Sequence, residues 1–328
     1  MIRQVGFIGL GVMGSGMAKN AAEAGFELTV HDANPAAVRA LEEHGARATA
    51  TPRRVAEASE VVVTVLPATP HVEQVYLGPD GIAEGIRPDS ITIDCSTISP
   101  VTVRRVAAAL AARGAHHLDA GMTACHQPPR RPEPVDAGVS KIVGQAQAGT
   151  MKLVIGGERA AFERAHPVLD AMSQEQVYCG PSGSGMVVKL GNNMLIASLL
   201  PLYFEVFVWA KKNGVEPDIL LEAFKGGASN STVLRGDVEQ WALRRRFEPG
   251  IFPIDYVHKD LTEGEHAAMA TNTPLLMVGL AKQLYEIARA KGLGGYYEPT
   301  VLKVLEELAG GVEVALEGYG SRARSPEA

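Results

Sequence analysis

Three glycines near the start of the chain have the spacing of a phosphate-binding turn. Gly9, Gly11 and Gly14 match G-x-G-x-x-G and directly follow the apolar run Val5 to Ile8. In such a turn the first glycine permits a tight bend, the second lets the backbone approach a pyrophosphate, and the third lets the next helix pack on the strand. The N–H groups at the start of that helix also attract phosphate. The pattern predicts a dinucleotide site made by Gly9, Gly11, Val12, Met13 and Gly14.

An acidic residue follows the second apolar run. Glu27 to Val30 predicts a strand, and Asp32 lies 18 positions after Gly14. A carboxylate at the tip of this strand accepts hydrogen bonds from the adenosine ribose and repels a 2′-phosphate, so it favours NAD over NADP. Arg39, farther along the chain, could weaken that preference. This order of strand, turn, helix, strand and acid favours a nucleotide site over the alternative, a glycine turn in a domain without nucleotide.

Lys189 and Asn193 have a spacing that suits acid–base chemistry. They lie four positions apart in a predicted helix, so both side chains are on one face. A lysine ammonium can protonate a carbonyl oxygen as hydride reaches the carbon, and a neutral amine can accept the hydroxyl proton in reverse. Asn193 could bond the same oxygen or orient the lysine. From the spacing alone, a surface lysine beside an asparagine of the first helical turns is an equal alternative.

The residues up to about 180 alternate between predicted strands and helices. The run Val61 to Leu66 is apolar throughout, as in a parallel strand that is covered on both faces. This alternation predicts an α/β domain with a Rossmann-type, doubly wound parallel sheet that binds ligands at the carboxyl ends of its strands. The predicted strands are 5–8, 27–30, 61–66, 91–94, 116–120 and 153–155, and the helices are 17–24, 100–113 and 158–172.

Beyond Gly183 the pattern becomes helical. Gly185 to about Asn213 predicts one long, mostly apolar helix, and shorter helices follow to Ala309. We therefore expect a dinucleotide-binding domain over residues 1–181 and an all-α substrate and dimerisation domain over 182–328, which the long interdomain helix begins. A helix this apolar must be buried, either between the domains or in a subunit interface. Because it presents more apolar surface than one small helical domain readily covers, we expect a homodimer or homotetramer. The residues expected to form the interface are Leu195, Leu199, Leu202, Phe204, Phe207 and Trp209.

Composition excludes several classes of function. The chain has 328 residues and a net charge of −6, which argues against nucleic acid as a partner. Met194 to Ala210 contains Pro201 and Glu205 and is short for a membrane span, so a buried helix is preferred and no membrane partner is expected. Three separate cysteines give no disulfide framework or metal site and fit a reducing compartment. With no room for a signal peptide before the first strand, we expect a cytoplasmic protein.

Four blocks in order resemble the β-hydroxyacid dehydrogenases, which include 3-hydroxyisobutyrate dehydrogenase and the tartronate and succinic semialdehyde reductases. The resemblance runs from Val5 to about Leu308 and implies hydride transfer between NAD(H) and a small 3-hydroxy acid or semialdehyde. It makes Lys189 the general acid/base and Asn193 its catalytic, substrate-binding neighbour. The blocks are Gly6 to Gly14, Asp136 to Ser140 with Ala148 to Thr150, Gly183 to Asn193, and His258 to Leu261.

The resemblance also implies further contacts to cofactor and substrate. Ser140 matches the serine that binds the substrate carboxylate, and Lys141 stands where the family has glycine, so it either adds a cationic contact to substrate or points to solvent. Gly138 likewise stands where the family pattern has proline. The further cofactor-binding residues are Leu66, Pro67, His71, Thr97, Phe252, Lys259 and Asp260.

An insertion precedes this serine loop. The loop normally begins where Asp119 stands, but its best match begins at Asp136, which lies 17 positions later. The added residues include Cys125, His126 and several prolines. Two adjacent residues make a poor metal site, so a proline-stiffened loop that shapes the substrate pocket or a subunit contact is favoured. We expect residues 121–135 to border the substrate rather than the adenine end of the cofactor.

Two other functions are compatible with the same fold. Imine reductases share this scaffold but usually lack a lysine at the position of Lys189. A dinucleotide-binding protein without catalysis would not need Lys189 and Asn193 together. The sequence does not name the hydroxy acid, because both departures fall on the loop that would select it.

Overall fold

The structure, a computed structural model, describes residues 2–131 and 141–320. The chain separates into two compact units, Met1–Leu190 and Gly191–Ala328. The division falls inside a continuous helix, α9 (Ser184–Lys212), so this helix contributes residues to both units. The expected boundary at 181/182 lies just before the same helix.

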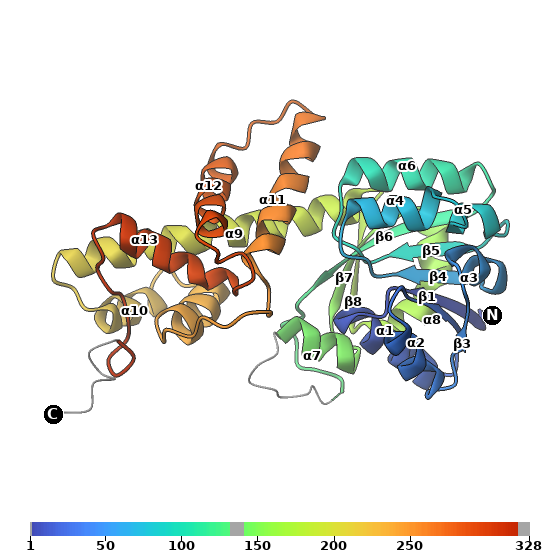
Figure 1. Cartoon of the computed structure of the whole chain (residues 1–328), viewed down its shortest axis with the longest axis horizontal. Coiled ribbons are helices and arrows are strands. Elements are labelled where there is room, and N and C mark those ends of the chain that lie inside the picture. The colour runs from blue at the N-terminus through green and yellow to red at the C-terminus, as the bar shows by residue number, and fades with distance from the viewer. Residues whose placement is uncertain (1, 132–140, 321–328) are drawn as a thin grey trace. The chain divides into compact units, whose positions relative to one another are not determined.

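The first unit contains one eight-stranded sheet in the order β3-β2-β1-β4-β5-β6-β7-β8 (Figure 1). The fold-class prediction of a Rossmann-type α/β unit followed by helices is confirmed. The sheet is not purely parallel, however, because β7 pairs antiparallel with β6. The strands are β1 (Gln4–Ile8), β2 (Glu27–His31), β3 (Arg47–Ala48), β4 (Val61–Thr64), β5 (Ile91–Asp94), β6 (His116–Thr123), β7 (Lys152–Gly157) and β8 (Glu175–Gly180).

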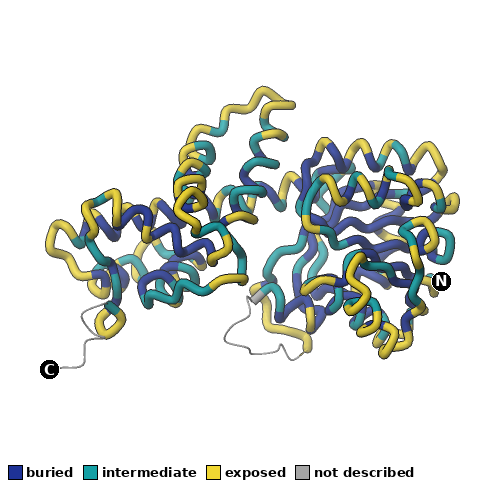
Figure 2. The backbone as a smooth tube through the Cα atoms, viewed as in Figure 1, coloured by how far each residue is buried: buried dark blue, intermediate teal, exposed yellow. Residues whose placement is uncertain are grey.

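Helices cover both faces of this sheet, which explains why its central strands are apolar throughout. In β4, Val61 and Val63 belong to the core on one side and Val62 to the core on the other, and all are fully buried. Figure 2 shows the central strands as buried. Helices α1 (Val12–Glu23), α2 (Pro35–Glu42), α7 (Lys141–Ala148) and α8 (Arg159–Met172) lie on the first side. Helices α3 (Pro52–Ala58), α4 (Thr69–Leu77), α5 (Ile82–Gly85) and α6 (Pro100–Ala111) lie on the second.

The structure differs from the predicted elements in several places. The first helix begins at Val12, directly on the glycine turn, rather than at Met17. Strand β6 continues to Thr123, so the first residues of the predicted insertion belong to the sheet. Strand β8 was not predicted, because its half-buried, partly polar residues give no clear period.

The second unit is helical, as predicted. Its core surrounds the C-terminal part of α9, where Phe204 and Phe207 are buried. Among its described residues, the only β pairings are isolated bridges such as Pro249 with Tyr296. The further elements are α10 (Pro217–Lys225), the π-helix η1 (Leu234–Ala242), α11 (Ile254–Met269), α12 (Leu276–Ala290), the 3₁₀ turn η2 (Glu298–Val301) and α13 (Leu302–Leu308).

The residues predicted for the interface do not share one environment, and Leu199 is partly buried against the core of the helical unit. Phe204 and Phe207 are buried inside their own unit, so including them was wrong. In contrast, Leu195, Leu202 and Trp209 are 74%, 51% and 65% exposed and recur every seven residues along α9. By length and composition alone α9 could cross a membrane, which is weak evidence because core helices of soluble proteins meet the same criterion.

Candidate active site

The glycine turn between β1 and α1 has little room for side chains. Gly9 has a φ of +90°, and a Cβ there would lie 2.2 Å from the Val65 carbonyl oxygen. A Cβ on Gly14 would lie 2.0 Å from the Gly9 carbonyl oxygen. Gly11 differs, since a Cβ there would meet nothing within 4 Å. The outer two glycines are therefore required by the fold, whereas Gly11 leaves open space.

That open space adjoins the N-terminus of α1. Gly11 is the N-cap residue and provides no side-chain hydrogen bond to the first turn, which also contains no acidic residue. The first N–H groups of an α-helix have no partner within the helix and carry a partial positive charge. Val12 and Met13 belong to this turn, so the residues present fit a dinucleotide pyrophosphate.

Asp32 lies at the end of β2 and binds the glycine turn directly. Its Oδ2 accepts the Leu10 N–H at 2.6 Å, and its Oδ1 accepts the Asn34 N–H at 2.6 Å. The Gly9 N–H also donates to the His31 carbonyl, at 3.1 Å. The carboxylate therefore fixes the turn that the glycines form. Sequence reasoning gave Asp32 only a role toward the ribose.

A buried polar network joins the ends of β4 and β5. Asp94 Oδ1 accepts hydrogen bonds from the hydroxyls of Thr64 (2.7 Å) and Ser96 (2.6 Å). Ser96 Oγ in turn accepts the Leu66 N–H at 2.8 Å. Burial raises the pKa of Asp94 to about 6, although these hydrogen bonds oppose the shift. The network fixes Leu66, a predicted cofactor residue, through groups that sequence reasoning missed.

The other cofactor residues predicted for this unit follow the same two strand ends. Pro67 and His71 are exposed, in the connection after β4 and in α4, and Thr97 is partly buried after β5. Because β4 and β5 are parallel neighbours, their carboxyl ends lie on one edge of the sheet. The structure thus brings the predicted strand-end residues to the edge that carries the glycine turn.

Lys189 is partly buried in the second turn of α9 and lies against β6. A Cβ placed on Gly121 would lie 2.6 Å from the Lys189 Cβ, so the lysine stem packs on the backbone of this strand. Two residues earlier, Asp119 accepts the N–H groups of Gly183 and Met186 at the start of α9, both at 2.8 Å. Sequence reasoning had assigned Asp119 only to the start of a displaced loop.

In the second unit, Asn193, Lys259 and Asp260 form one cluster. The Asn193 amide donates to Asp260 Oδ2 at 2.6 Å, and Lys259 Nζ lies 3.0 Å from Asp260 Oδ1 in an ion pair. Asp260 is 3% exposed and its Oδ1 accepts no hydrogen bond, so the ion pair with Lys259 is what offsets the burial of that oxygen. Phe252, partly buried, stacks edge-on against Tyr256 with ring centroids 6.3 Å apart.

Part of the predicted insertion is held by two glutamines. Gln145, on α7, accepts the Cys125 N–H and donates to the Cys125 carbonyl, at 2.8 and 2.7 Å. Gln174 accepts the Arg130 N–H at 2.6 Å and donates to the Pro128 carbonyl at 2.8 Å. Ser140 lies outside the described residues, and Lys141 is the first residue of α7. A pocket border formed by 121–135 stays a prediction.

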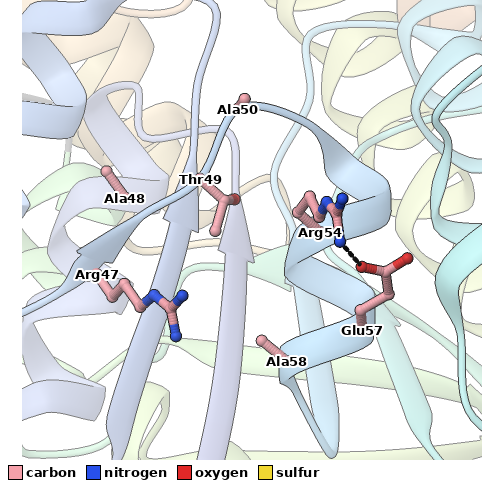
Figure 3. A pocket seen from close by; sticks show the side chains of 7 residues that line it. All are labelled: Arg47, Ala48, Thr49, Ala50, Arg54, Glu57 and Ala58. Atoms are coloured by element: carbon pink, nitrogen blue, oxygen red, sulfur yellow. Dashed lines mark hydrogen bonds and ion pairs between the residues drawn. The ribbon is translucent and has the colours of Figure 1, made fainter.

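A hollow of about 410 Å³ lies elsewhere, beside β3 and α3 (Figure 3). None of the predicted site residues lines it, and Arg54 and Glu57 on its wall pair with each other at 2.8 Å. Among residues 2–131 and 141–320, no cluster of three or more His, Cys, Asp or Glu side chains could hold a metal ion.

Comparison with known proteins identifies relatives over most of the chain. Residues 4–133 and 129–180 match the NAD-binding domain of 6-phosphogluconate dehydrogenase, and residues 183–305 match the NAD-binding domain of NADP-dependent 3-hydroxyisobutyrate dehydrogenase. The 3-hydroxyisobutyrate dehydrogenase of Pseudomonas aeruginosa is 35% identical over 86% of this chain and 91% of its own length. The 2-(hydroxymethyl)glutarate dehydrogenase of Eubacterium barkeri is 32% identical over 94% and 96%.

A solved structure is similar over the same extent. The Mycobacterium tuberculosis 3-hydroxyisobutyrate dehydrogenase with L-serine has a TM-score of 0.81 and 27% identity, covering 93% of this chain and 99% of its own. An NAD-dependent L-serine dehydrogenase from Pseudomonas aeruginosa is 34% identical over 89% of this chain and 94% of its own length. The family resemblance read from the four sequence blocks is confirmed.

Proposed function

The chain belongs to the β-hydroxyacid dehydrogenase family, whose members are NAD(P)-dependent oxidoreductases, and we propose that it prefers NAD. We further propose that it interconverts a small 3-hydroxy acid and the corresponding semialdehyde, with Lys189 as general acid/base. The observation that supports this proposal is the placement of Lys189, whose stem packs on Gly121 near the carboxyl end of β6. When bound, the nicotinamide supplies or accepts the hydride.

Lys189 handles the proton of the reaction. In reduction its ammonium donates a proton to the substrate carbonyl oxygen as the carbon receives hydride. In oxidation its neutral amine accepts the proton of the hydroxyl. A lysine suits both directions because its ammonium is a donor and its free amine an acceptor.

Asn193 lies one helical turn after Lys189 on α9, where its side chain can hydrogen-bond the same substrate oxygen that exchanges a proton with the lysine. Its Nδ2 already donates to Asp260, which fixes the plane of the amide and hence the direction of its other groups. A fixed donor or acceptor loses less entropy when substrate binds than a freely rotating one. We therefore assign Asn193 to orienting the substrate oxygen relative to Lys189.

Substrate choice is assigned to the segment that leads into α7. We propose that Ser140 binds the substrate carboxylate and that Lys141 adds a cationic contact. The names of the relatives suggest a test panel of 3-hydroxyisobutyrate, L-serine and 2-(hydroxymethyl)glutarate. Reduction of NAD⁺ with each acid, followed at 340 nm, tests the substrate class.

The decisive variant is Lys189→Ala, assayed with the best acid of the panel. We expect kcat to fall by about 10²–10⁴-fold, the loss typical of a missing general acid/base, while NAD affinity stays nearly constant. Lys291→Ala is the control, since Lys291 pairs with Glu307 in the helical unit and its loss should leave kcat unchanged. Activity retained by Lys189→Ala would overturn the assignment of the lysine.

We also propose that the protein is a homo-oligomer that buries the exposed stripe of α9. Leu195, Leu202 and Trp209 stand on one side of the helix and are more than half exposed. Contiguous apolar surface of this kind is usually covered by another subunit. Sedimentation should show a dimer or tetramer, and Leu202→Glu should shift it toward monomer. A wild-type monomer at micromolar concentration would contradict the proposal.

A further inference from the structure

The start of α9 is in direct backbone contact with β6 and β7. A Cβ on Gly185 would lie 2.5 Å from the Asp119 carbonyl oxygen and 2.6 Å from that of Val154. A Cβ on Gly156 would lie 2.7 Å from the Gly185 nitrogen. Two facing glycines therefore allow an approach that no side chain would permit, and the first turn of α9 lies directly against the backbone of both strands.

The carboxylate of Asp119 fixes the same turn along the helix axis. Its Oδ1 accepts the Gly183 N–H and its Oδ2 accepts the Met186 N–H, each at 2.8 Å. Asp119 is fully buried, and a Cβ on Gly156 would lie 2.6 Å from its Oδ1, so the carboxylate is enclosed. Hydrogen bonds from backbone N–H groups to a charged acceptor are among the stronger ones, and a helix N-terminus favours a negative charge.

Lys189 lies one turn after Met186, and its stem is placed by the same strand. A Cβ on Gly121 would lie 2.6 Å from the Lys189 Cβ and 3.0 Å from its Cγ. Gly121 and Asp119 are two residues apart in β6, so they lie on the same face of the sheet. On one face of β6, the Asp119 carboxylate therefore binds the start of α9, and Gly121, which has no side chain, leaves room for the lysine stem.

We propose that Asp119 is a positioning residue for Lys189 and that Gly121 provides the space in which the lysine stem packs. This inference rests on the proposed role of Lys189 as acid/base. Asp119 contacts neither substrate nor cofactor in this role. It sets the position of the helix that carries the lysine, and a shift of about 1 Å in a reacting group can cost on the order of 10²-fold in rate.

The test uses Asp119→Asn in the full-length enzyme. An amide retains one acceptor oxygen but presents an NH₂ group to the second N–H, so one of the two hydrogen bonds is lost. We expect kcat to fall by about 10- to 100-fold, while KM for the hydroxy acid and Kd for NAD change less than about threefold.

The control is Glu60→Gln, the same chemical change in a similar arrangement. Glu60 accepts the N–H groups of Arg3 and Gln4 at 2.7 and 3.0 Å, at the start of β1. It touches neither α9 nor any predicted site residue in these contacts. Its substitution should leave kcat, KM and Kd for NAD unchanged.

A double-mutant cycle separates positioning from general damage. If Asp119 acts through Lys189, Asp119→Asn should have almost no effect on the residual rate of Lys189→Ala. An equal fractional loss in both backgrounds would overturn the inference. Full kcat in Asp119→Asn, together with an inactive Lys189→Ala, would overturn it while leaving the proposed function intact. Full activity in Lys189→Ala would instead reject the proposed function.

Gly121→Ala decides the matter if Asp119→Asn does not fold. It keeps the carboxylate and adds one methyl group, which would lie 2.6 Å from the Lys189 Cβ and 3.0 Å from Val154 Cγ2. We expect a fall in kcat of about 10-fold or more with NAD binding retained. A folded Gly121→Ala enzyme with wild-type kcat would show that Lys189 does not depend on this contact, and the inference would be wrong.

Discussion

The two units hold their candidate site residues by different means. In the sheet unit, Gly9 and Gly14 lie so close to backbone carbonyl oxygens that neither has room for a Cβ, and Asp32 binds the turn between them through the Leu10 N–H. In the helical unit Asn193, Lys259 and Asp260 hold one another through their side chains. A site made of backbone tolerates only particular residues at each position, whereas a site made of side chains depends on partners distant in sequence.

The largest effects should come from the glycine turn and should differ between its members. Gly14→Ala would place a methyl group 2.0 Å from the Gly9 carbonyl oxygen, so the turn must deform. We expect a loss of unfolding free energy of about 1–3 kcal/mol, as for overpacking, and loss of measurable NAD binding. Gly11→Ala should leave stability nearly unchanged, since nothing lies within 4 Å, yet weaken NAD binding at least 10-fold.

Thermal unfolding and NAD titration of the two variants check this contrast. Wild-type NAD affinity in Gly11→Ala would show that the pyrophosphate does not approach this residue. Wild-type stability in Gly14→Ala would show that the contact with Gly9 relaxes at little cost. Either result would remove the distinction between structural and ligand-facing glycines in the turn.

The contrast between the units also explains which parts of the fold and of the candidate site could be predicted from the sequence. The turn, the parallel strands and the long helix were predictable because each has a local pattern: glycine spacing, apolar runs and a helical period. The reversed direction of β7 was not, since a short apolar strand reads the same in either direction. Nor was the bond from Asp119 to α9, which joins residues more than 60 positions apart. Lys259 and Asp260 were named only through the family resemblance.

The next effect in size tests the side-chain cluster of the helical unit. Asp260→Asn removes the charge that pairs with Lys259 and that the Asn193 amide contacts at 2.6 Å. A hydrogen bond to a charged group contributes about 1.5–3 kcal/mol, so we expect kcat/KM to fall by about 10- to 100-fold. Asn193→Ala should cause a similar fall, and the double variant should be no worse than either single one. Additive losses would mean that the two residues act separately.

A smaller effect concerns cofactor choice. Asp32 combines the two kinds of contact, because its side chain binds backbone N–H groups of the turn. Asp32→Asn removes the charge that would repel a 2′-phosphate, so the ratio of kcat/KM for NADP to that for NAD should rise by about 10-fold. Efficiency with NAD should fall as well, because an amide cannot accept both the Leu10 and Asn34 N–H groups. A wild-type enzyme that already prefers NADP would show that another residue overrides Asp32.

Asp94 is the exception within the sheet unit, because side-chain hydroxyls rather than backbone contacts dominate its surroundings. Its Oδ1 accepts the Thr64 and Ser96 hydroxyls, while its Oδ2 is buried with no hydrogen-bond partner. Asp119, its partner in the register of β5 and β6, adds a like charge. Burial and this neighbour raise the pKa of Asp94 to about 6, against an ordinary value near 4.

This shift has a definite sign in the pH dependence of stability. Because the folded protein binds the Asp94 proton more tightly than the unfolded chain, the stabilising contribution is complete below about pH 4 and is lost as pH rises through about 6. Asp94→Asn cannot titrate at this position and does not lose this contribution. The free energy of unfolding of the variant minus that of wild type should therefore be larger at pH 7.5 than at pH 4.5, by on the order of 2 kcal/mol. Urea unfolding of both proteins at the two pH values measures this difference, and other titrating groups cancel except for the coupling to Asp119. If the difference in free energy of unfolding between variant and wild type is the same at both pH values, Asp94 has the same pKa in the folded protein as in the unfolded chain. Its hydroxyl partners would then compensate fully for the effect of burial on that pKa.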